Sequence, residues 1–325
     1  MTKGIRIHET GGPEKLLYED VDVGAPGQGE IRIRHSAIGL NFIDCYQRSG
    51  LYPLPGLPLI LGAEGAGVVE ELGAGVTDLA IGQRVAYAGG QIGSYTEERT
   101  MSADVVVPVP DSIDDQTAAA MMLKGMTVYM LLHRCYTVQP GNTVLVHAAA
   151  GGVGTIMCQW AKHLGATVIG TVGTEEKAEI AKAHGCDHPI LYTKVNFAER
   201  VREITGGIGI QAVYDSIGKD TFMDSLDCLE KFGSLVSFGN ASGPAPEISP
   251  LLLMQKGSLF LNRPTLMNYT EKRENVLKAS QALFDVVSGG QVKIEVSQTY
   301  ALENTAEAHA DLEARRTTGC TVLLP

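Results

Sequence analysis

The chain has 325 residues, of which 44 % are hydrophobic and 19 % charged, so it is long enough for two ordinary globular domains and lacks the composition of a disordered protein. Its formal net charge of −11 argues against nucleic acid as a partner, because nucleic-acid binders usually carry basic patches. The N-terminus lacks the apolar stretch of a secretory signal, and no apolar run approaches the ~20 residues that span a bilayer. We therefore expect a cytoplasmic protein without a membrane segment. The six cysteines show no C-x-x-C spacing, which predicts reduced, mostly buried thiols.

The first third of the chain is rich in glycine, proline and short β-like runs, such as residues 31–34 and 105–107, and it predicts a β-rich module. From Asp111 the pattern becomes helical, and beyond it apolar strands and helices alternate. That alternation predicts an α/β fold with a doubly wound parallel sheet covered on both faces. The expected strands are 143–148, 167–172, 188–192, 210–216, 234–239 and 258–263, and the expected helices lie near 152–164, 175–184, 196–204 and 220–229.

The segment after Pro264 does not continue this sheet. It predicts an amphipathic helix at about 271–288, a polar strand near 294–300, a helix near 303–316 and a terminal strand at 321–324. Because chain termini often lie close together, we expect these elements to return to the first module.

A dinucleotide fingerprint follows the first strand of the expected sheet. Gly151 and Gly154 match the last two glycines of G-x-G-x-x-G, with Ala149 at the first position. The turn lies where a strand becomes a helix, so backbone amides and the positive helix end can meet a pyrophosphate. The order of elements, more than any single glycine, predicts a dinucleotide site.

The second strand of that unit indicates which dinucleotide is bound. It ends at Gly173 without the carboxylate that commonly binds the ribose 2′-hydroxyl of NAD, and Lys177 and Tyr192 follow nearby. Glycine leaves room for a 2′-phosphate, which an ammonium and a phenol can hold, so the pattern predicts NADPH. The alternative is that Lys177 is an ordinary solvated lysine and that Glu175 or Glu176 serves a ribose.

Four longer segments resemble the medium-chain dehydrogenase/reductase superfamily, within it the zinc-free quinone oxidoreductase branch that includes zeta-crystallin. They are residues 39–52, 62–69, 123–127 and 147–154, and the resemblance extends over essentially the whole chain. It implies a GroES-like β-rich catalytic domain formed by 1–123 and 265–325, and a Rossmann dinucleotide-binding domain formed by 124–264.

The resemblance implies an NADPH:quinone reductase, often a homodimer, and it assigns site residues by position. The nicotinamide end would be lined by Asn41, Tyr46, Tyr52 and Thr127, and the pyrophosphate would meet Gly151, Gly152 and Val153. The ribose phosphate would be held by Gly173, Lys177 and Tyr192, and the remaining cofactor wall would be Ser216, Phe238, Gly239 and Arg263. Arg315 in the last helix is a further cofactor residue, although the neighbouring Arg316 could take its role.

Zinc enzymes of this superfamily place a cysteine at the position of Asn41 and a histidine at that of Ala63. Without this cysteine and this histidine, Glu64 has no neighbouring residues with which to bind zinc, so no metal is expected. No cysteine lies between Cys45 and Cys135, which also removes the structural zinc lobe. Without a Lewis acid the substrate must already accept electrons well, as a quinone does, and as a conjugated enone or alkenal does in the second interpretation.

Tyr46 and Tyr52 are the expected catalytic donors to a developing oxyanion, with Asn41 positioning the nicotinamide. The alternative is that both tyrosines, in a loop bounded by glycines and prolines, form a wall over the cofactor. Asp44 and Glu64 are expected to fix loops by hydrogen bonding. A hypothesis of another class, a non-catalytic dinucleotide- or RNA-associated protein, is disfavoured by the intact cofactor motifs and the acidic charge.

The last strand of the expected sheet predicts the oligomeric state. An apolar strand at 258–263 would expose backbone groups together with Leu259, Phe260 and Leu261, and pairing with a twofold mate would satisfy both. The alternative is that a C-terminal helix of the same chain covers this edge.

Overall fold

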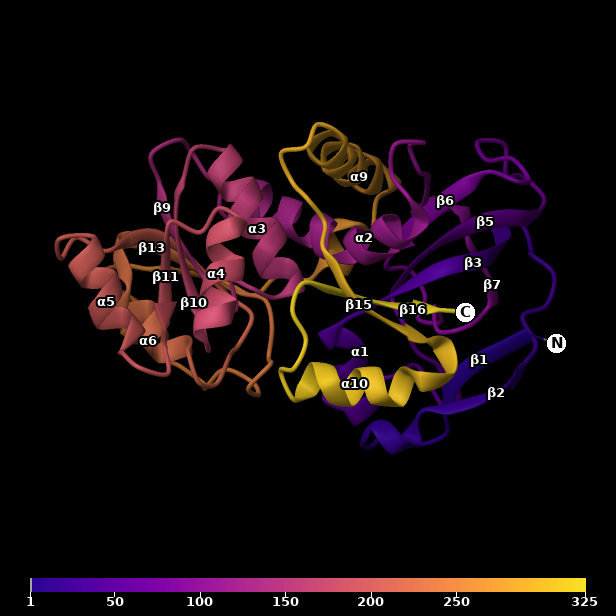
Figure 1. Cartoon of the computed structure of the whole chain (residues 1–325), viewed down its shortest axis with the longest axis horizontal. Coiled ribbons are helices and arrows are strands. Elements are labelled where there is room, and N and C mark those ends of the chain that lie inside the picture. The colour runs from indigo at the N-terminus through magenta and orange to yellow at the C-terminus, as the bar shows by residue number, and fades with distance from the viewer. Residues whose placement is uncertain (1) are drawn as a thin grey trace. The chain divides into compact units, whose positions relative to one another are not determined.

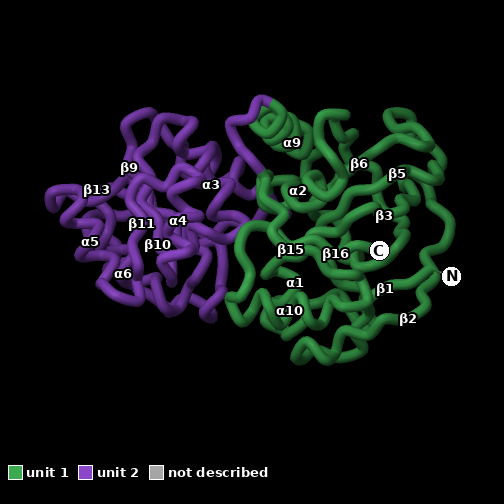
Figure 2. Tube along the Cα trace, viewed as in Figure 1, with its two compact units in different colours: residues 1–126, 269–288, 294–325 green, residues 127–268, 289–293 purple. Residues whose placement is uncertain are grey.

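The structure, a computed structural model, describes residues 2–325, which form two compact units (Figure 2). Unit 1 contains the described residues up to Met126 together with Tyr269–Ser288 and Ile294–Pro325, and unit 2 contains Thr127–Asn268 and Gly289–Lys293. Unit 1 contains two sheets and unit 2 one, and each unit has its own buried apolar residues. None of the helices in residues 2–325 combines the length and the apolar character needed to cross a membrane.

Unit 2 is built on a six-stranded parallel sheet with the strand order β11-β10-β9-β12-β13-β14 (Figure 1). The strands are β9 (Thr143–Val146), β10 (Thr167–Val172), β11 (His188–Leu191), β12 (Ile210–Asp215), β13 (Leu229–Ser237) and β14 (Phe260–Asn262). In chain order this is 3-2-1-4-5-6, the doubly wound dinucleotide-binding topology. The predicted sheet is therefore confirmed, with several strands one or two residues shorter and β13 five residues longer at its start.

Polar side chains cap three of the five helices that follow in unit 2, α4, α5 and α7. The five are α3 (Gly152–His163), α4 (Glu175–Ala183), α5 (Phe197–Ile204), α6 (Phe222–Asp227) and α7 (Pro250–Gln255). Thr174 accepts the amide hydrogen of Lys177 at the start of α4, and Ser249 accepts that of Leu251 at the start of α7. The helix α7 was not predicted, although a serine followed by proline is a helix-start signal.

Unit 1 contains a seven-stranded sheet and a three-stranded sheet, as expected of a β-rich module. The larger runs β15-β16-β3-β5-β6-β8, with β7 also paired to β3, and the smaller runs β2-β1-β4. Their bounds are β1 (Thr2–Ile7), β2 (Leu17–Val21), β3 (Glu30–Leu40), β4 (Leu59–Ile60), β5 (Glu64–Leu72), β6 (Arg84–Ala88), β7 (Glu98–Ser102), β8 (Val106–Pro108), β15 (Val296–Ala301) and β16 (Cys320–Leu324).

The last strand of the chain lies inside the larger sheet of unit 1. In β16, Val322 pairs antiparallel with Gly39 of β3, and on its other side β16 pairs parallel with β15. The prediction that the C-terminal elements return to the first module is thereby confirmed (Figure 1).

The helices of unit 1 include one that the sequence did not predict. They are α1 (Phe42–Ser49), α9 (Arg273–Ser288) and α10 (Thr305–Glu313), and α2 (Asp115–Met130) runs from unit 1 into unit 2. The short helix α8 (Leu266–Tyr269), which the sequence did not predict either, lies in unit 2 except for its last residue. At α1 the carboxylate of Asp44 accepts the amide hydrogen of Asn41, and Gly50 ends the helix with φ +81°. Tyr46 therefore lies on a helix, and its predicted place in a loop was wrong.

Two further expectations are corrected. The helix α10 ends at Glu313, so Arg315 lies beyond it, with φ +59°, rather than in the last helix. Leu259 is only 6 % exposed and packs in the core of unit 2, so it is not an exposed residue of the edge strand, whereas Phe260 and Leu261 of β14 are exposed. The amide of Leu259 donates to the carbonyl of Leu253 in α7 at 3.1 Å, which holds Leu259 against the core before the strand begins.

Candidate active site

The fingerprint turn joins β9 to α3 in unit 2. Gly151 is the N-cap of α3, and its amide donates to the carbonyl oxygen of Ala148 at 2.9 Å. A Cβ atom on Gly154 would lie 2.2 Å from that same carbonyl oxygen, so only glycine allows the helix to begin this close to the turn. The amides of Gly152 and Val153 are in the first turn of α3, where backbone N–H groups have no intrahelical acceptor. This is the arrangement that receives a pyrophosphate.

Gly173 and Tyr192 meet at the carboxyl ends of β10 and β11. A Cβ atom on Gly173 would lie 3.0 Å from the Tyr192 hydroxyl, so glycine keeps the space beneath this hydroxyl open. No carboxylate ends β10, and Lys177 lies in the first turn of α4. Glu175, the acid considered for a ribose, forms a surface ion pair of 2.6 Å with Lys194.

The remaining expected wall residues lie at the same edge of this sheet. Ser216 follows β12, Phe238 and Gly239 follow β13, and Arg263 follows β14. A Cβ atom on Gly239 would lie 2.4 Å from the carbonyl oxygen of Ser216, and the guanidinium of Arg263 donates to the carbonyl of Ser237 at 3.1 Å. Carboxyl ends of parallel strands form the ligand edge of open α/β sheets, and the structure brings these residues to it. The residues of unit 2 therefore fit a dinucleotide.

Asp215, which the sequence analysis did not single out, shapes this edge. Its carboxylate, at the end of β12, accepts the amides of Ile217 and Gly218 at 2.8 and 3.1 Å and the hydroxyl of Thr221. These hydrogen bonds of Asp215 fix the conformation of the turn that contains Ser216. An aspartate directly after an apolar strand is the signal that could have identified it.

In unit 1, the start of α1 carries the residues expected at the nicotinamide end. The rings of Tyr46 and Tyr52 lie 5.2 Å apart at an angle of 57°, and the amide of Tyr52 donates to the carbonyl of Tyr46 at 3.0 Å. Both tyrosines are half-buried, whereas Asn41, the N-cap of α1, is buried. Thr127 lies in α2, at the first residue of unit 2, and is half-buried.

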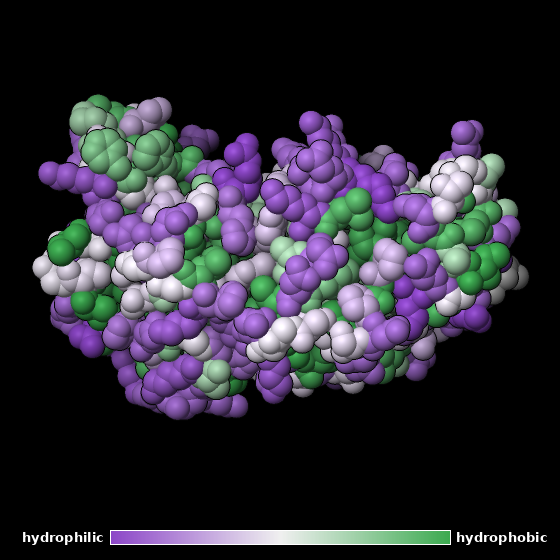
Figure 3. All heavy atoms as spheres, turned by 90° about the horizontal axis from the view of Figure 1, so that it is seen from above, coloured by the Kyte–Doolittle hydropathy of each residue, from purple (hydrophilic) through white to green (hydrophobic). Residues whose placement is uncertain are grey.

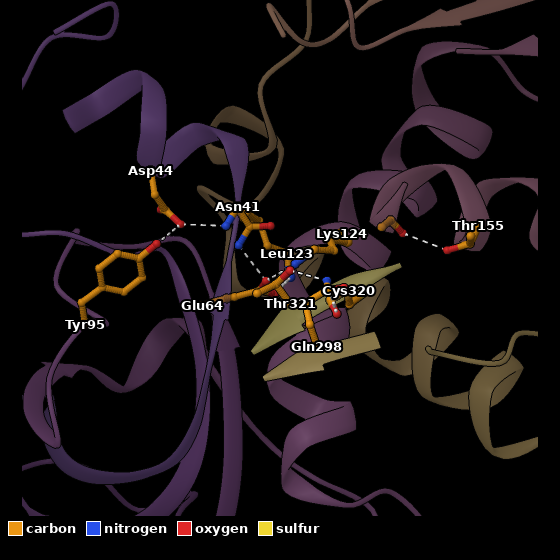
Figure 4. Close-up of polar contacts among 11 residues, drawn as sticks. Asn41, Asp44, Glu64, Tyr95, Leu123, Lys124, Thr155, Gln298, Cys320 and Thr321 are labelled. Atoms are coloured by element: carbon orange, nitrogen blue, oxygen red, sulfur yellow. Dashed lines mark hydrogen bonds and ion pairs between the residues drawn. The ribbon is translucent and has the colours of Figure 1, made fainter. Parts of the chain in front are cut away.

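Glu64 is the centre of a buried polar cluster next to Asn41 (Figure 4). One carboxylate oxygen, Oε1, accepts both the Asn41 amide nitrogen and the Lys124 ammonium at 2.7 Å, and the other, Oε2, accepts the backbone amide of Leu123 at 2.6 Å. Burial, the largest single contribution, would lower the pKa of Lys124, but the surrounding negative charges, that of Glu64 above all, and the hydrogen bond to Glu64 together raise that pKa. Glu64 thus acts through hydrogen bonds, as expected, but its partners are the N-cap residue of α1 and two residues of α2 and not loops.

The sequence analysis included Lys124 only within residues 123–127, one of the four segments that resemble the superfamily. A lysine within the apolar helical run 118–126 is the signal that could have identified it, since lysine is almost never fully buried unless it is paired. Its side chain is 8 % exposed and that of Glu64 is 0 % exposed.

The residues around Glu64 also show whether this position could bind a zinc ion. Glu64 already holds an ammonium and an amide, and neither Asn41 nor Ala63 offers the thiolate or imidazole that zinc prefers. Among residues 2–325 there is no group of three or more histidine, cysteine, aspartate or glutamate side chains placed to hold a metal. The donor set at this position does not fit a zinc ion.

A second buried network lies under α1. The hydroxyl of Tyr95 donates to Asp44 at 2.7 Å and accepts from His309 at 3.0 Å, while Arg48 donates to the other nitrogen of His309 at 3.0 Å. Burial raises the pKa of Asp44 to about 7, and burial together with Arg48 lowers the pKa of His309 to about 3. These groups hold the helix that carries Asn41 and Tyr46.

Arg316, which follows α10, pairs with Asp311, whose carboxylate accepts the Nε hydrogen of Arg316 at 2.8 Å. This ion pair occupies the guanidinium of Arg316.

Comparison with known proteins agrees with this geometry. Residues 27–111 match the alcohol dehydrogenase GroES-like domain family, and residues 152–282 match the zinc-binding dehydrogenase family. A quinone oxidoreductase of Pseudomonas aeruginosa is 51 % identical over the whole of both chains. The chain belongs to the medium-chain dehydrogenase/reductase superfamily, in its quinone oxidoreductase branch.

Two other members of the branch bear on the chemistry. The crystal structure of Escherichia coli quinone oxidoreductase complexed with NADPH superposes with a TM-score of 0.97 at 46 % identity, covering 99 % of this chain and all of that one. A 2-haloacrylate reductase from Burkholderia sp. is 49 % identical over 98 % of each chain.

Proposed function

We propose that the protein is an NADPH-dependent quinone oxidoreductase that transfers reducing equivalents without a metal. The choice of NADPH as cofactor rests on the residues at the end of β10. There Gly173 leaves space beside the hydroxyl of Tyr192, and no carboxylate would repel a 2′-phosphate. The E. coli relative that was crystallised with NADPH supports this choice. Bound NADPH would supply the hydride, and the residues of the chain would bind, orient and shield it.

The roles of the residues follow the two units. In the proposed Rossmann domain, residues 124–264, the first turn of α3 would bind the pyrophosphate, Lys177 and Tyr192 the ribose phosphate, and Ser216, Phe238, Gly239 and Arg263 the cofactor wall. In the proposed catalytic domain, residues 1–123 and 265–325, Asn41 would orient the nicotinamide. Arg315 would add a cofactor contact from the same domain, and Thr127 would line the nicotinamide end from α2.

Tyr46 and Tyr52 would lie beside the acceptor. Their tilted rings form one aromatic surface, which suits a flat quinone, and either hydroxyl could donate to a developing oxyanion. Because reduction makes a quinone an aromatic hydroquinone, its oxygens need only protons, and no Lewis acid is required.

A second candidate is reduction of a conjugated carbon–carbon double bond. The relative named 2-haloacrylate reductase favours it, because a haloacrylate is an alkene activated by the carboxyl group beside it. Hydride added to the β-carbon of an enone or alkenal gives a delocalised enolate, which the same donors could stabilise.

We also propose a cytoplasmic homodimer joined through β14. This strand ends the parallel sheet, and Phe260 and Leu261 are 61 % and 38 % exposed. Phe232 and Met254, also exposed, lie in or near the neighbouring β13 and α7, and apolar side chains gather on the left of Figure 3, within unit 2. A twofold mate would pair the free strand edge and cover these side chains.

The function is tested by following NADPH oxidation with quinones, enones and alkenals side by side in the purified protein. Quinones should be reduced with the highest kcat/KM. A clear preference for enones or alkenals would establish the second candidate, and NADPH binding without oxidation by any acceptor would favour a non-catalytic role.

A further inference from the structure

Asn41 is held by two carboxylates, each on a different part of the residue. Asp44 accepts its backbone amide at 2.9 Å, and Glu64 accepts its side-chain nitrogen at 2.7 Å. All three residues are buried. The first contact places the backbone at the start of α1, and the second determines how the side-chain amide is turned.

The orientation of the Asn41 side-chain amide matters because its nitrogen and its oxygen differ chemically. The nitrogen only donates hydrogen bonds and the oxygen accepts them. A carboxylate beside an ammonium only accepts, so Glu64 requires the nitrogen of Asn41 to face it. The oxygen of Asn41 is then presented away from Glu64.

Lys124 and the backbone keep Glu64 in this role. The ammonium of Lys124 lies 2.7 Å from Oε1, and the backbone amide of Leu123 lies 2.6 Å from Oε2. Gly39 on β3 makes room for the carboxylate, since a Cβ atom there would lie 2.2 Å from Oε1. A buried carboxylate needs such compensation, and here three donors surround it (Figure 4).

We propose that Glu64 and Lys124 are positioning residues that fix the Asn41 amide, so that Asn41 presents a hydrogen-bond acceptor, its oxygen, to the nicotinamide carboxamide of NADPH. The carboxamide nitrogen of nicotinamide is the matching donor. This inference rests on the proposed function, which places Asn41 at the nicotinamide end.

Two double variants that share Glu64→Gln give opposite expectations. In Glu64→Gln/Lys124→Met, the Leu123 amide holds the oxygen of the new glutamine, so its nitrogen faces Asn41, whose amide must turn and present a donor. In Asn41→Asp/Glu64→Gln, the glutamine nitrogen faces a carboxylate that Lys124 can neutralise, and position 41 still presents an acceptor.

The measurement is the dissociation constant of NADPH, obtained from the change in NADPH fluorescence on binding. The dissociation constant of adenosine 2′,5′-bisphosphate, which lacks the nicotinamide, is measured for comparison. The Glu64→Gln/Lys124→Met variant should bind NADPH about tenfold to a hundredfold more weakly, the cost of an unmade hydrogen bond in a buried site. The Asn41→Asp/Glu64→Gln variant should recover most of this loss, because position 41 still presents an acceptor to the nicotinamide. Binding of the bisphosphate should not change in either.

The outcomes distinguish a failure of the proposed function from a failure of the positioning role. If the original protein binds neither ligand, the proposed function fails. If it binds both, but the two double variants lose NADPH equally, lose the bisphosphate as well, or lose nothing, the positioning role of Glu64 and Lys124 is overturned. Thermal unfolding of each variant identifies one that does not fold. In that case Asn41→Leu takes the place of Glu64→Gln/Lys124→Met, with the same expected loss, and unchanged NADPH binding by Asn41→Leu would refute the inference.

Discussion

The hydroxyl of Tyr95 donates a 2.7 Å hydrogen bond to Asp44, and both side chains are fully buried. Burial raises the pKa of Asp44 to about 7 although this bond opposes the shift. A carboxyl group whose pKa is higher in the folded than in the unfolded protein contributes stability that is complete below its unfolded pKa and is lost as the pH rises through the folded value.

The first prediction follows from that sign. Between about pH 4 and pH 7 the folded protein loses stability through Asp44, by about 1.4 kcal/mol for each unit of pKa difference. Buried His309 and His35, whose pKa values burial lowers to about 3, act in the opposite direction below about pH 6.5. Urea unfolding of the original protein and Asp44→Asn across this range therefore isolates Asp44 as the difference between them. A difference that does not change with pH would contradict the raised pKa.

The second prediction concerns the choice of cofactor. Lys177→Glu should weaken NADPH far more than NADH, because one charge-assisted contact is worth about 1.5–3 kcal/mol and the new carboxylate repels the phosphate. Dissociation constants for both cofactors check this. The matched control is Lys182→Glu, a change of the same charge in the last turn of α4, which should affect neither cofactor. Equal losses in Lys177→Glu would show that Lys177 does not recognise the phosphate.

The third prediction separates the two roles considered for Tyr52. Tyr52→Phe should lower kcat by about a hundredfold or more if the hydroxyl donates to an oxyanion, and only modestly if the ring is a wall against Tyr46. Steady-state kinetics with a quinone and an enone measure both cases. Tyr52→Ala with unaltered kinetics toward every acceptor would remove this residue from the site.

The fourth prediction concerns metal. Glu64 holds Lys124 and Asn41 rather than a ligand set, so the purified protein should contain no stoichiometric zinc and should keep its activity in chelator. Elemental analysis and an assay in EDTA check this, and one tightly bound zinc per chain would refute the metal-free mechanism.

The fifth prediction tests the dimer. Light scattering at micromolar concentration should give about twice the 34.6 kDa mass of the chain, and Phe260→Asp should shift it toward the monomer. Ile208→Asp, at an exposed apolar residue before β12, is the control and should leave the mass unchanged. A monomeric original protein under these conditions would disprove the proposal.

The sequence predicted most of the parallel sheet because each strand is an apolar run bounded by a turn, with a helix after it. It failed at α1, whose buried positions include the polar residues Asp44, Gln47 and Arg48, so that no apolar stripe marks the helix in the sequence. It also missed the ion pair of Glu64 with Lys124, because these residues lie far apart in the chain and meet only when β5 packs near α2. Pairings of this kind are a property of the tertiary structure.

The place of β16 inside its sheet sets an order of assembly. Within unit 1, β3 has β5 and β7 as partners early in synthesis, but the stretch around Gly39 gains Val322 only when the far end of the chain emerges from the ribosome. Unit 2 contains all six of its strands well before that point. A nascent chain would therefore be able to complete the parallel sheet of unit 2 while the sheet of unit 1 that includes β3 still lacks a strand, so the emergence of β16 sets when that second sheet is complete.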